Sequence, residues 1–140
     1  DIDGIELSLR RSRDLYAEAF EGARDDYYTG INAAAKSILL GAPDDLKKAD
    51  EYATRVLEIV GTVPSQGDYW KTATSAEAFL MRTKYAEAAA LYQAAVAMAP
   101  SETGSHGSTW KQASRLMSKL GTSPEDRALV RKPFNHIPEA

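Results

Sequence analysis

The sequence predicts an all-α protein in which about seven short helices stack into an α-α superhelix of the helical-repeat kind. Helix-forming residues, alanine above all, dominate the 140 residues. No stretch alternates apolar and polar residues for long, and no Asn-Gly or Asp-Gly hairpin turn occurs. Short helical segments follow one another in pairs joined by tight turns, which is typical of structural repeats. The length fits a single helical domain over residues 1–140.

Apolar spacing at helical period places the seven helices. Their expected ranges are about 5–24, 28–40, 44–60, 68–82, 85–99 and 108–120, with a short last helix and a tail over 124–140. The first helix is supported by an apolar stripe of Leu9, Tyr16, Phe20 and Ala23.

Capping and stop signals justify the boundaries in the first half of the chain. The second helix ends at Gly41, because glycine adopts the left-handed cap and Pro43 cannot continue a helix. Asp44 is the predicted N-cap of the third helix, which ends at Gly61. Asp68 is the predicted N-cap of the fourth.

The second half has equally clear signals. Pro100 closes the fifth helix, and the composition of residues 101–107 predicts a flexible loop. The sixth helix is therefore expected to start at Ser108-Thr109. Ser123 and Pro124, followed by two acidic residues, form a strong start for the seventh.

Residues 69–102 match a helix-pair repeat that closes on Pro100. The small and aromatic positions of this repeat are Ala76, Phe79, Ala88, Tyr92 and Ala95. Small residues let two antiparallel helices approach closely, and large neighbours fill the grooves beside them. The length of this segment, the turn between its helices and its closing proline are those of a tetratricopeptide repeat of about 34 residues. A second, longer copy covers 28–61, and such units stack into a right-handed superhelix.

Several short motifs resemble a narrower family. Tyr28-Thr29-Gly30-Ile31-Asn32 resembles the Tyr-Pro-Gly-Ile-Asn motif in the central regulatory region of apoptosis signal-regulating kinases, with Thr29 in place of the proline. Later parts of that region are similar to Asp68-Tyr69-Trp70, Ala73-Thr74, the helix from Tyr85 to Pro100, and Ser108-Thr109. It is the TRAF-binding region of these MAP kinase kinase kinases, and tetratricopeptide proteins with it also occur in bacteria. The alanine-rich composition is similar to that of a bacterial relative. The resemblance implies an interaction segment of a larger signalling protein.

Composition excludes several functional classes. The formal net charge is -3 with both signs interspersed, so no basic stripe predicts nucleic-acid binding. No apolar run approaches the ~20 residues that span a bilayer, and no signal peptide is visible, so we expect a cytoplasmic protein. The absence of cysteine excludes disulfides, thiolate catalysis and cysteine zinc sites. Because the sequence begins at Asp1, we expect a piece of a longer chain.

No motif for catalysis, a cofactor or a metal is present. His106 and His136, the only histidines, lie in predicted loops without partners at a defined spacing. The acidic pairs Asp25-Asp26 and Asp44-Asp45 precede helices, where carboxylates cap free amides. Walker, GxGxxG and GxSxG motifs are missing, and Gly30 is expected to be a close-packing glycine. We therefore predict that the protein is not an enzyme and has no cofactor.

The repeat register places a set of side chains on the concave surface. These are Asn32, Lys36, Leu39, Ala73, Glu77 and Leu80, joined by Lys111 and Arg115 if the sixth helix continues the array. Trp70 also falls on this surface, either as a binding anchor or in packing, whereas Trp110 falls on a core position. A basic groove favours an acidic peptide or a terminal carboxylate, and the alternative is that the cations are solvated surface charges. The candidate partner-binding residues are Asn32, Lys36, Trp70, Glu77, Lys111 and Arg115.

The sequence therefore predicts a non-enzymatic module that binds a protein or peptide in its concave groove. The alternative is a structural linker or self-association element that positions a separate effector domain, and a homo-oligomer is then possible. A small-molecule binder or enzyme has no motif in its favour and would need a deep, enclosed polar pocket.

Overall fold

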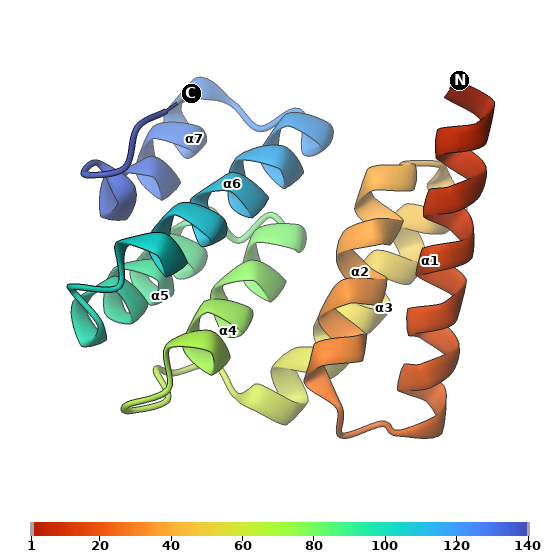
Figure 1. Cartoon of the computed structure of the whole chain (residues 1–140), viewed down its shortest axis with the longest axis horizontal. Coiled ribbons are helices and arrows are strands. Elements are labelled where there is room, and N and C mark those ends of the chain that lie inside the picture. The colour runs from red at the N-terminus through yellow and green to blue at the C-terminus, as the bar shows by residue number, and fades with distance from the viewer. Residues whose placement is uncertain (1, 140) are drawn as a thin grey trace.

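The computed structural model describes residues 2–139, and this part of the chain is all-helical, with seven α-helices and a final 3-10 turn (Figure 1). The elements are α1 (Ile2–Gly22), α2 (Tyr27–Leu40), α3 (Pro43–Val60), α4 (Tyr69–Met81), α5 (Tyr85–Met98), α6 (Thr103–Leu120), α7 (Pro124–Arg131) and η1 (Lys132–Phe134). The predicted all-α, helical-repeat-like architecture is confirmed.

The helices pack mainly against their neighbours along the chain. Helix α2 packs on α3 and α4 on α5, while α1 covers α2 and α7 covers α5. Helices α2, α4 and α6 form one layer, with α3 and α5 behind it (Figure 1). Because α6 also contacts both α2 and α4, these three helices share one surface of the molecule.

Small residues make the close packing possible. The alanines Ala76, Ala88 and Ala95 are almost completely buried, as the repeat pattern predicts. Gly30 is a close-packing glycine, because a Cβ atom there would lie only 2.7 Å from Phe20 Cζ and 2.8 Å from Val56 Cγ2. Large side chains fill the spaces between these contacts, and Trp110, 3% exposed, is in the core as expected.

Most predicted boundaries are confirmed by cap geometry. Asp26 accepts hydrogen bonds from the backbone N–H groups of α2, Asp68 from that of Lys71, and Ser123 from that of Asp126. Gly41 ends α2 with φ of 77°, a conformation that favours glycine.

The predicted N-cap at Asp44 is wrong by two residues. Helix α3 begins at Pro43, whose fixed φ suits the first helical position, and Ala42 occupies the N-cap. Asp45 accepts a hydrogen bond from the Ala42 N–H at 3.3 Å, so the cap comes from within the helix. Asp44 is exposed in the first turn.

The predicted loop over residues 101–107 is also wrong, because α6 begins at Thr103 rather than after Ser108. His106, expected to be exposed, is fully buried. Its Nε2 lies 2.8 Å from the Ala99 carbonyl oxygen and its Nδ1 lies 2.8 Å from Nε2 of His136. Burial and these two hydrogen bonds outweigh the weak helix propensity of the glycines around it.

Candidate partner-binding groove

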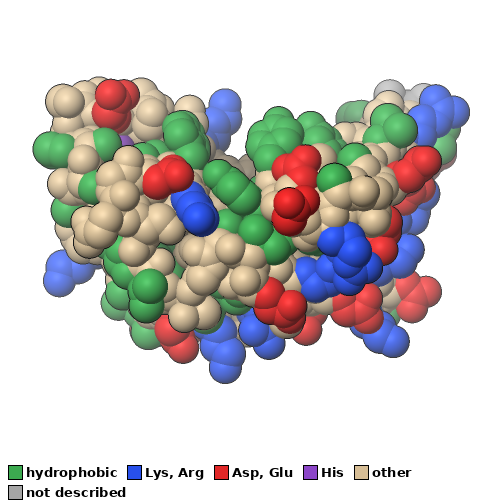
Figure 2. Space-filling view, turned by 90° about the horizontal axis from the view of Figure 1, so that it is seen from below, with side chains coloured by type: hydrophobic (Ala, Val, Ile, Leu, Met, Phe, Trp, Pro, Cys, Tyr) green, Lys and Arg blue, Asp and Glu red, His purple; other side chains and the backbone are tan. Residues whose placement is uncertain are grey.

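A groove of about 540 Å³ lies on the surface shared by α2, α4 and α6. Helix α4 forms its floor, and α2 and α6 form its walls. Figure 2 shows the molecule hollowed between its two halves, with hydrophobic side chains on both sides of the hollow. Where α2 ends, Lys119 of α6 packs close over Gly41, so the two walls meet at that end.

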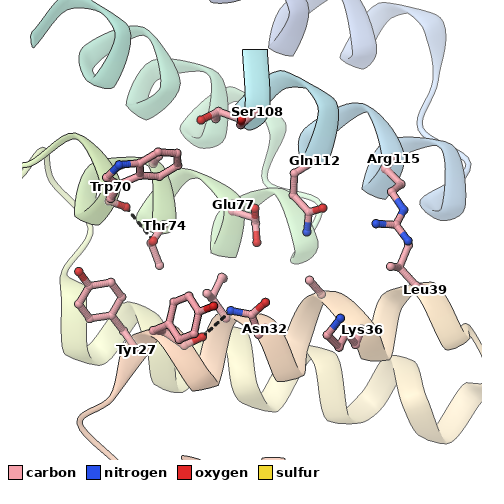
Figure 3. A pocket seen from close by; sticks show the side chains of 15 residues that line it. Tyr27, Asn32, Lys36, Leu39, Trp70, Thr74, Glu77, Ser108, Gln112 and Arg115 are labelled. Carbon is pink, nitrogen blue, oxygen red and sulfur yellow. Dashed lines mark hydrogen bonds between the residues drawn. The ribbon is translucent and has the colours of Figure 1, made fainter. Parts of the chain in front are cut away.

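One end of the groove is aromatic. Tyr27 and Tyr28 come from the first turn of α2, and Trp70 from the first turn of α4 (Figure 3). Tyr28 is 61% exposed and Trp70 54%, which is unusual for large rings in a well-packed helical array. Trp70 is oriented by an edge-on contact with Tyr69, at 5.0 Å between ring centroids, and the Tyr69 hydroxyl lies 2.7 Å from that of Thr109. The aromatic end is therefore both accessible and held in place.

The other end of the groove is cationic. Lys36 of α2 and Arg115 of α6 point into it from opposite walls (Figure 3). Among the described residues neither forms an ion pair, although most other arginines of the chain do. The Lys36 ammonium group lies 5.6 Å from the centroid of the Tyr16 ring, a weak attraction that leaves its charge uncompensated. Two positive charges are therefore available to an anion at this end.

Polar side chains occupy the middle of the groove. Asn32 donates a hydrogen bond to the Tyr28 carbonyl oxygen at 2.9 Å, so its own side-chain oxygen remains free to accept one. Glu77 and Gln112 point toward the centre from the floor and the α6 wall (Figure 3). Burial raises the pKa of Glu77 to about 7, and the nearby Gln112 amide acts in the opposite direction. Glu77 is therefore partly protonated near neutral pH.

The structure brings most of the predicted site residues together. Asn32, Lys36, Trp70, Glu77 and Arg115 line the groove, as do Leu39 and Ala73. Trp70 lies on the groove surface and is not part of the core.

Two residues lie elsewhere. Leu80 was expected on the concave surface but is fully buried, because the helix turns its side chain inward toward the core. Lys111 is exposed but outside the groove, since it lies one residue, or about 100° of helix rotation, before Gln112.

Some residues that line the groove were not predicted from the sequence. Ser108, Gln112 and Arg115 form one stripe of α6 at helical spacing, which could have identified Gln112. Tyr28 opens the motif at the start of α2 and Tyr27 precedes it, but nothing in the sequence indicates that both rings line the groove.

The described residues contain no group of three or more His, Cys, Asp or Glu side chains arranged to hold a metal ion. No helix among them is long and apolar enough to cross a membrane. The groove lining includes no histidine or cysteine.

Comparison of the chain with protein-family models, with curated proteins and with solved structures finds no match. Any function must therefore be argued from the groove and its side chains.

Proposed function

We propose that this protein is a non-catalytic interaction module that binds an acidic peptide segment in the groove between α2, α4 and α6. The observation that supports this most directly is the polarity of the groove. Exposed aromatic rings lie at one end, and at the other lie two cations that form no ion pair within the described part of the chain. An apolar side chain suits the first end and a carboxylate suits the second.

The dimensions of the groove define the segment that fits it. Tyr28 and Lys36 are eight residues apart on α2, which corresponds to about 12 Å along the helix axis. An extended peptide advances roughly 3.3 Å per residue. The segment should therefore carry an apolar side chain and, three or four residues away, an acidic residue or a terminal carboxylate.

The two ends contribute to binding in different ways. Large rings in a partly enclosed site supply most of the binding energy of typical interfaces. Exposed charges such as Arg115 contribute mainly to specificity and to the rate of association, and salt screens them.

We also propose that this module is a tetratricopeptide-type segment of a larger cytoplasmic signalling protein, related to the TRAF-binding region of apoptosis signal-regulating kinases and its bacterial relatives. The motif that begins at Tyr28 and the motif that contains Trp70 support this relation, and both motifs contribute side chains to the groove.

We propose no catalytic role for the groove. Hydrolytic chemistry with serine or threonine needs a base beside the nucleophile. The groove offers the hydroxyls of Thr74, Ser108 and Thr109 but no histidine. It is also an open hollow rather than an enclosed chamber, which suits a peptide better than a small substrate (Figure 2).

The test is a titration with two fluorescent peptides. The acidic probe is the N-acetylated sequence Phe-Ala-Ser-Glu-Glu, and the amide probe has glutamine in place of both glutamates. We expect saturable binding of the acidic probe that weakens with salt, and binding of the amide probe at least tenfold weaker. Equal affinity for both probes, or no binding of either, would contradict the proposed ligand.

A specific observation favours a second candidate function, which is self-association through α1. Helix α1 exposes large apolar side chains, with exposed fractions of 83% for Ile2, 68% for Ile5, 50% for Leu7 and 68% for Leu15. Exposed apolar side chains concentrated on one element are typical of an interaction site. Light scattering over a range of protein concentrations tests this candidate. A concentration-dependent mass that Leu15→Glu abolishes would support it, and a constant monomer mass would exclude it.

A further inference from the structure

Among the described residues that line the groove, Glu77 is the one acidic side chain. It lies on α4 between the aromatic end and the cationic end, and its neighbours from the walls, Asn32 and Gln112, are neutral amides (Figure 3). No ion pair of Glu77 occurs among the described residues. A carboxyl group without a cationic partner among the described residues therefore lies where an acidic segment would have to lie.

Burial makes the charge of Glu77 costly. Tyr92 of α5, which is near enough for its charge to interact with that of Glu77, is fully buried, and its hydroxyl lacks a hydrogen-bond partner among the described residues. The charge of Glu77 adds to burial in raising the pKa of Tyr92, so that the phenol stays neutral. The remaining titratable or charged groups of the groove are the phenols of Tyr27 and Tyr28, the ammonium of Lys36 and the guanidinium of Arg115.

We propose that the groove binds its acidic segment together with one proton, which Glu77 takes up, so that pH regulates occupancy of the groove. This inference rests on the proposed function. A ligand carboxylate held by Lys36 and Arg115 would share the groove with Glu77, and repulsion between the two carboxylates disfavours the ionised form of Glu77. Protonated Glu77 removes the repulsion and gains a hydrogen-bond donor that can face the ligand.

The direction of the pH effect follows from linkage. Burial already raises the pKa of Glu77 to about 7 in the empty groove. A bound carboxylate raises this pKa further, because it disfavours the charged form. The complex therefore holds more protons than the free protein, and affinity falls as pH rises above about 7. Below that pH the free protein is already protonated at Glu77, and affinity levels off until the ligand itself is protonated.

The experiment measures the dissociation constant of the acidic probe at pH 5.5, 7.0 and 8.5. We expect binding to be roughly tenfold or more weaker at pH 8.5 than at pH 5.5. Glu77→Gln removes the titrating group but keeps the shape of the side chain, so it should bind at pH 8.5 at least tenfold more tightly than the parent does. Calorimetry in buffers of different ionisation enthalpy should show net proton uptake by the parent at pH 7.5 and none by Glu77→Gln.

Glu87→Gln is the matched control, because Glu87 is exposed on α5 outside the groove and its loss changes the net charge equally. It should retain the pH dependence of the parent, and thermal melts should show that each variant is folded. Binding of the acidic probe with one affinity from pH 5.5 to 8.5 overturns the inference alone. Failure to bind at every pH overturns the proposed ligand and this inference with it.

Discussion

The two tryptophans of the chain occupy opposite environments. Trp70 is 54% exposed on the groove, whereas Trp110 is 3% exposed and packs against Phe134, with Arg131 over its ring. Sequence alone left Trp70 open between anchor and packing, because its repeat position faces the groove but a tryptophan can also pack there. Only the tertiary structure separates the two roles.

Truncation of each tryptophan should therefore have opposite effects. Trp70→Ala should weaken binding of the acidic probe by ~2 kcal/mol or more, as expected for an interface anchor, and should barely change the melting temperature. Trp110→Ala should lower the free energy of unfolding by about 3–5 kcal/mol, because it leaves a large cavity. Titrations and urea unfolding of both variants provide the comparison. If Trp70→Ala unfolds the protein, Trp70 belongs to the core after all.

Gly30 and Gly107 provide a second matched pair, both within helices. A methyl group at Gly30 would collide with Phe20 and Val56, whereas a methyl group at Gly107 would meet no atom within 4 Å. Gly30→Ala should destabilise the protein by about 1–3 kcal/mol through overpacking. Gly107→Ala should stabilise it by up to about 1 kcal/mol, because alanine favours the helix. Chemical denaturation measures the free energy of unfolding of both variants. Equal changes in the two variants would refute the close packing of α1 and α2 at Gly30.

Helix α1 is joined to the rest of the array by a buried polar cluster. The Arg13 guanidinium donates hydrogen bonds to Asp45 of α3 at 2.9 Å and to the Ser37 hydroxyl of α2 at 3.2 Å. Arg13 and Asp45 are each only 3% exposed. Burial alone would raise the pKa of Asp45, but the hydrogen bond and charge of Arg13 lower it below its usual value.

Asp45→Asn should therefore destabilise the protein by about 3 kcal/mol at pH 7, because it leaves Arg13 buried with less compensation. Since the pKa of Asp45 is lowered in the folded state, its contribution is complete above the unfolded-state value near 3.9 and is lost as pH falls below it. The difference between parent and variant should accordingly shrink from pH 7 to pH 3 in urea unfolding.

The neighbouring Asp44 is the control for this prediction. It is exposed in the same turn of α3, so Asp44→Asn removes only a favourable interaction with the helix dipole, worth about 0.3–1 kcal/mol. If Asp44→Asn lowers the free energy of unfolding as much as Asp45→Asn does, the start of helix α3, and not the buried Arg13–Asp45 pair, holds α1 in place.

The helix boundaries show where prediction from sequence succeeds and where it stops. Gly41, Asp68 and Ser123 act through their immediate neighbours, so local chemistry was enough to place the ends they mark. The start of α6 depends on His106, which is buried against Ala99 and His136, 30 residues further along the chain. Local propensity favoured a loop there, and a long-range contact overrides it.

At the scale of the whole molecule, the groove is predictable because the helix pairs repeat. The buried alanines of one helix pair show which face of each helix packs inward, and the repeat then places the equivalent positions of the next helix pair on the same surface. This reasoning predicted that Lys36, Trp70 and Glu77 lie on one surface, and all three line the groove. The same reasoning wrongly placed Leu80 and Lys111 on the groove surface. Leu80 and Lys111 lie off the stripes of α4 and α6 that face the groove, and a repeat pattern alone does not fix the rotation of each helix about its axis.

The central claim is that a cationic end of this groove recognises an acidic segment, and two charge reversals test it most directly. Lys36 lies in the groove, whereas Lys111 is exposed outside it. Both Lys36→Glu and Lys111→Glu change the net charge by the same amount. We predict that Lys36→Glu weakens binding of the acidic probe roughly tenfold or more at low salt, and less at high salt, because salt screens charges that solvent can reach. Lys111→Glu should change the affinity less than twofold, and equal losses in the two variants, or none in either, would contradict the claim.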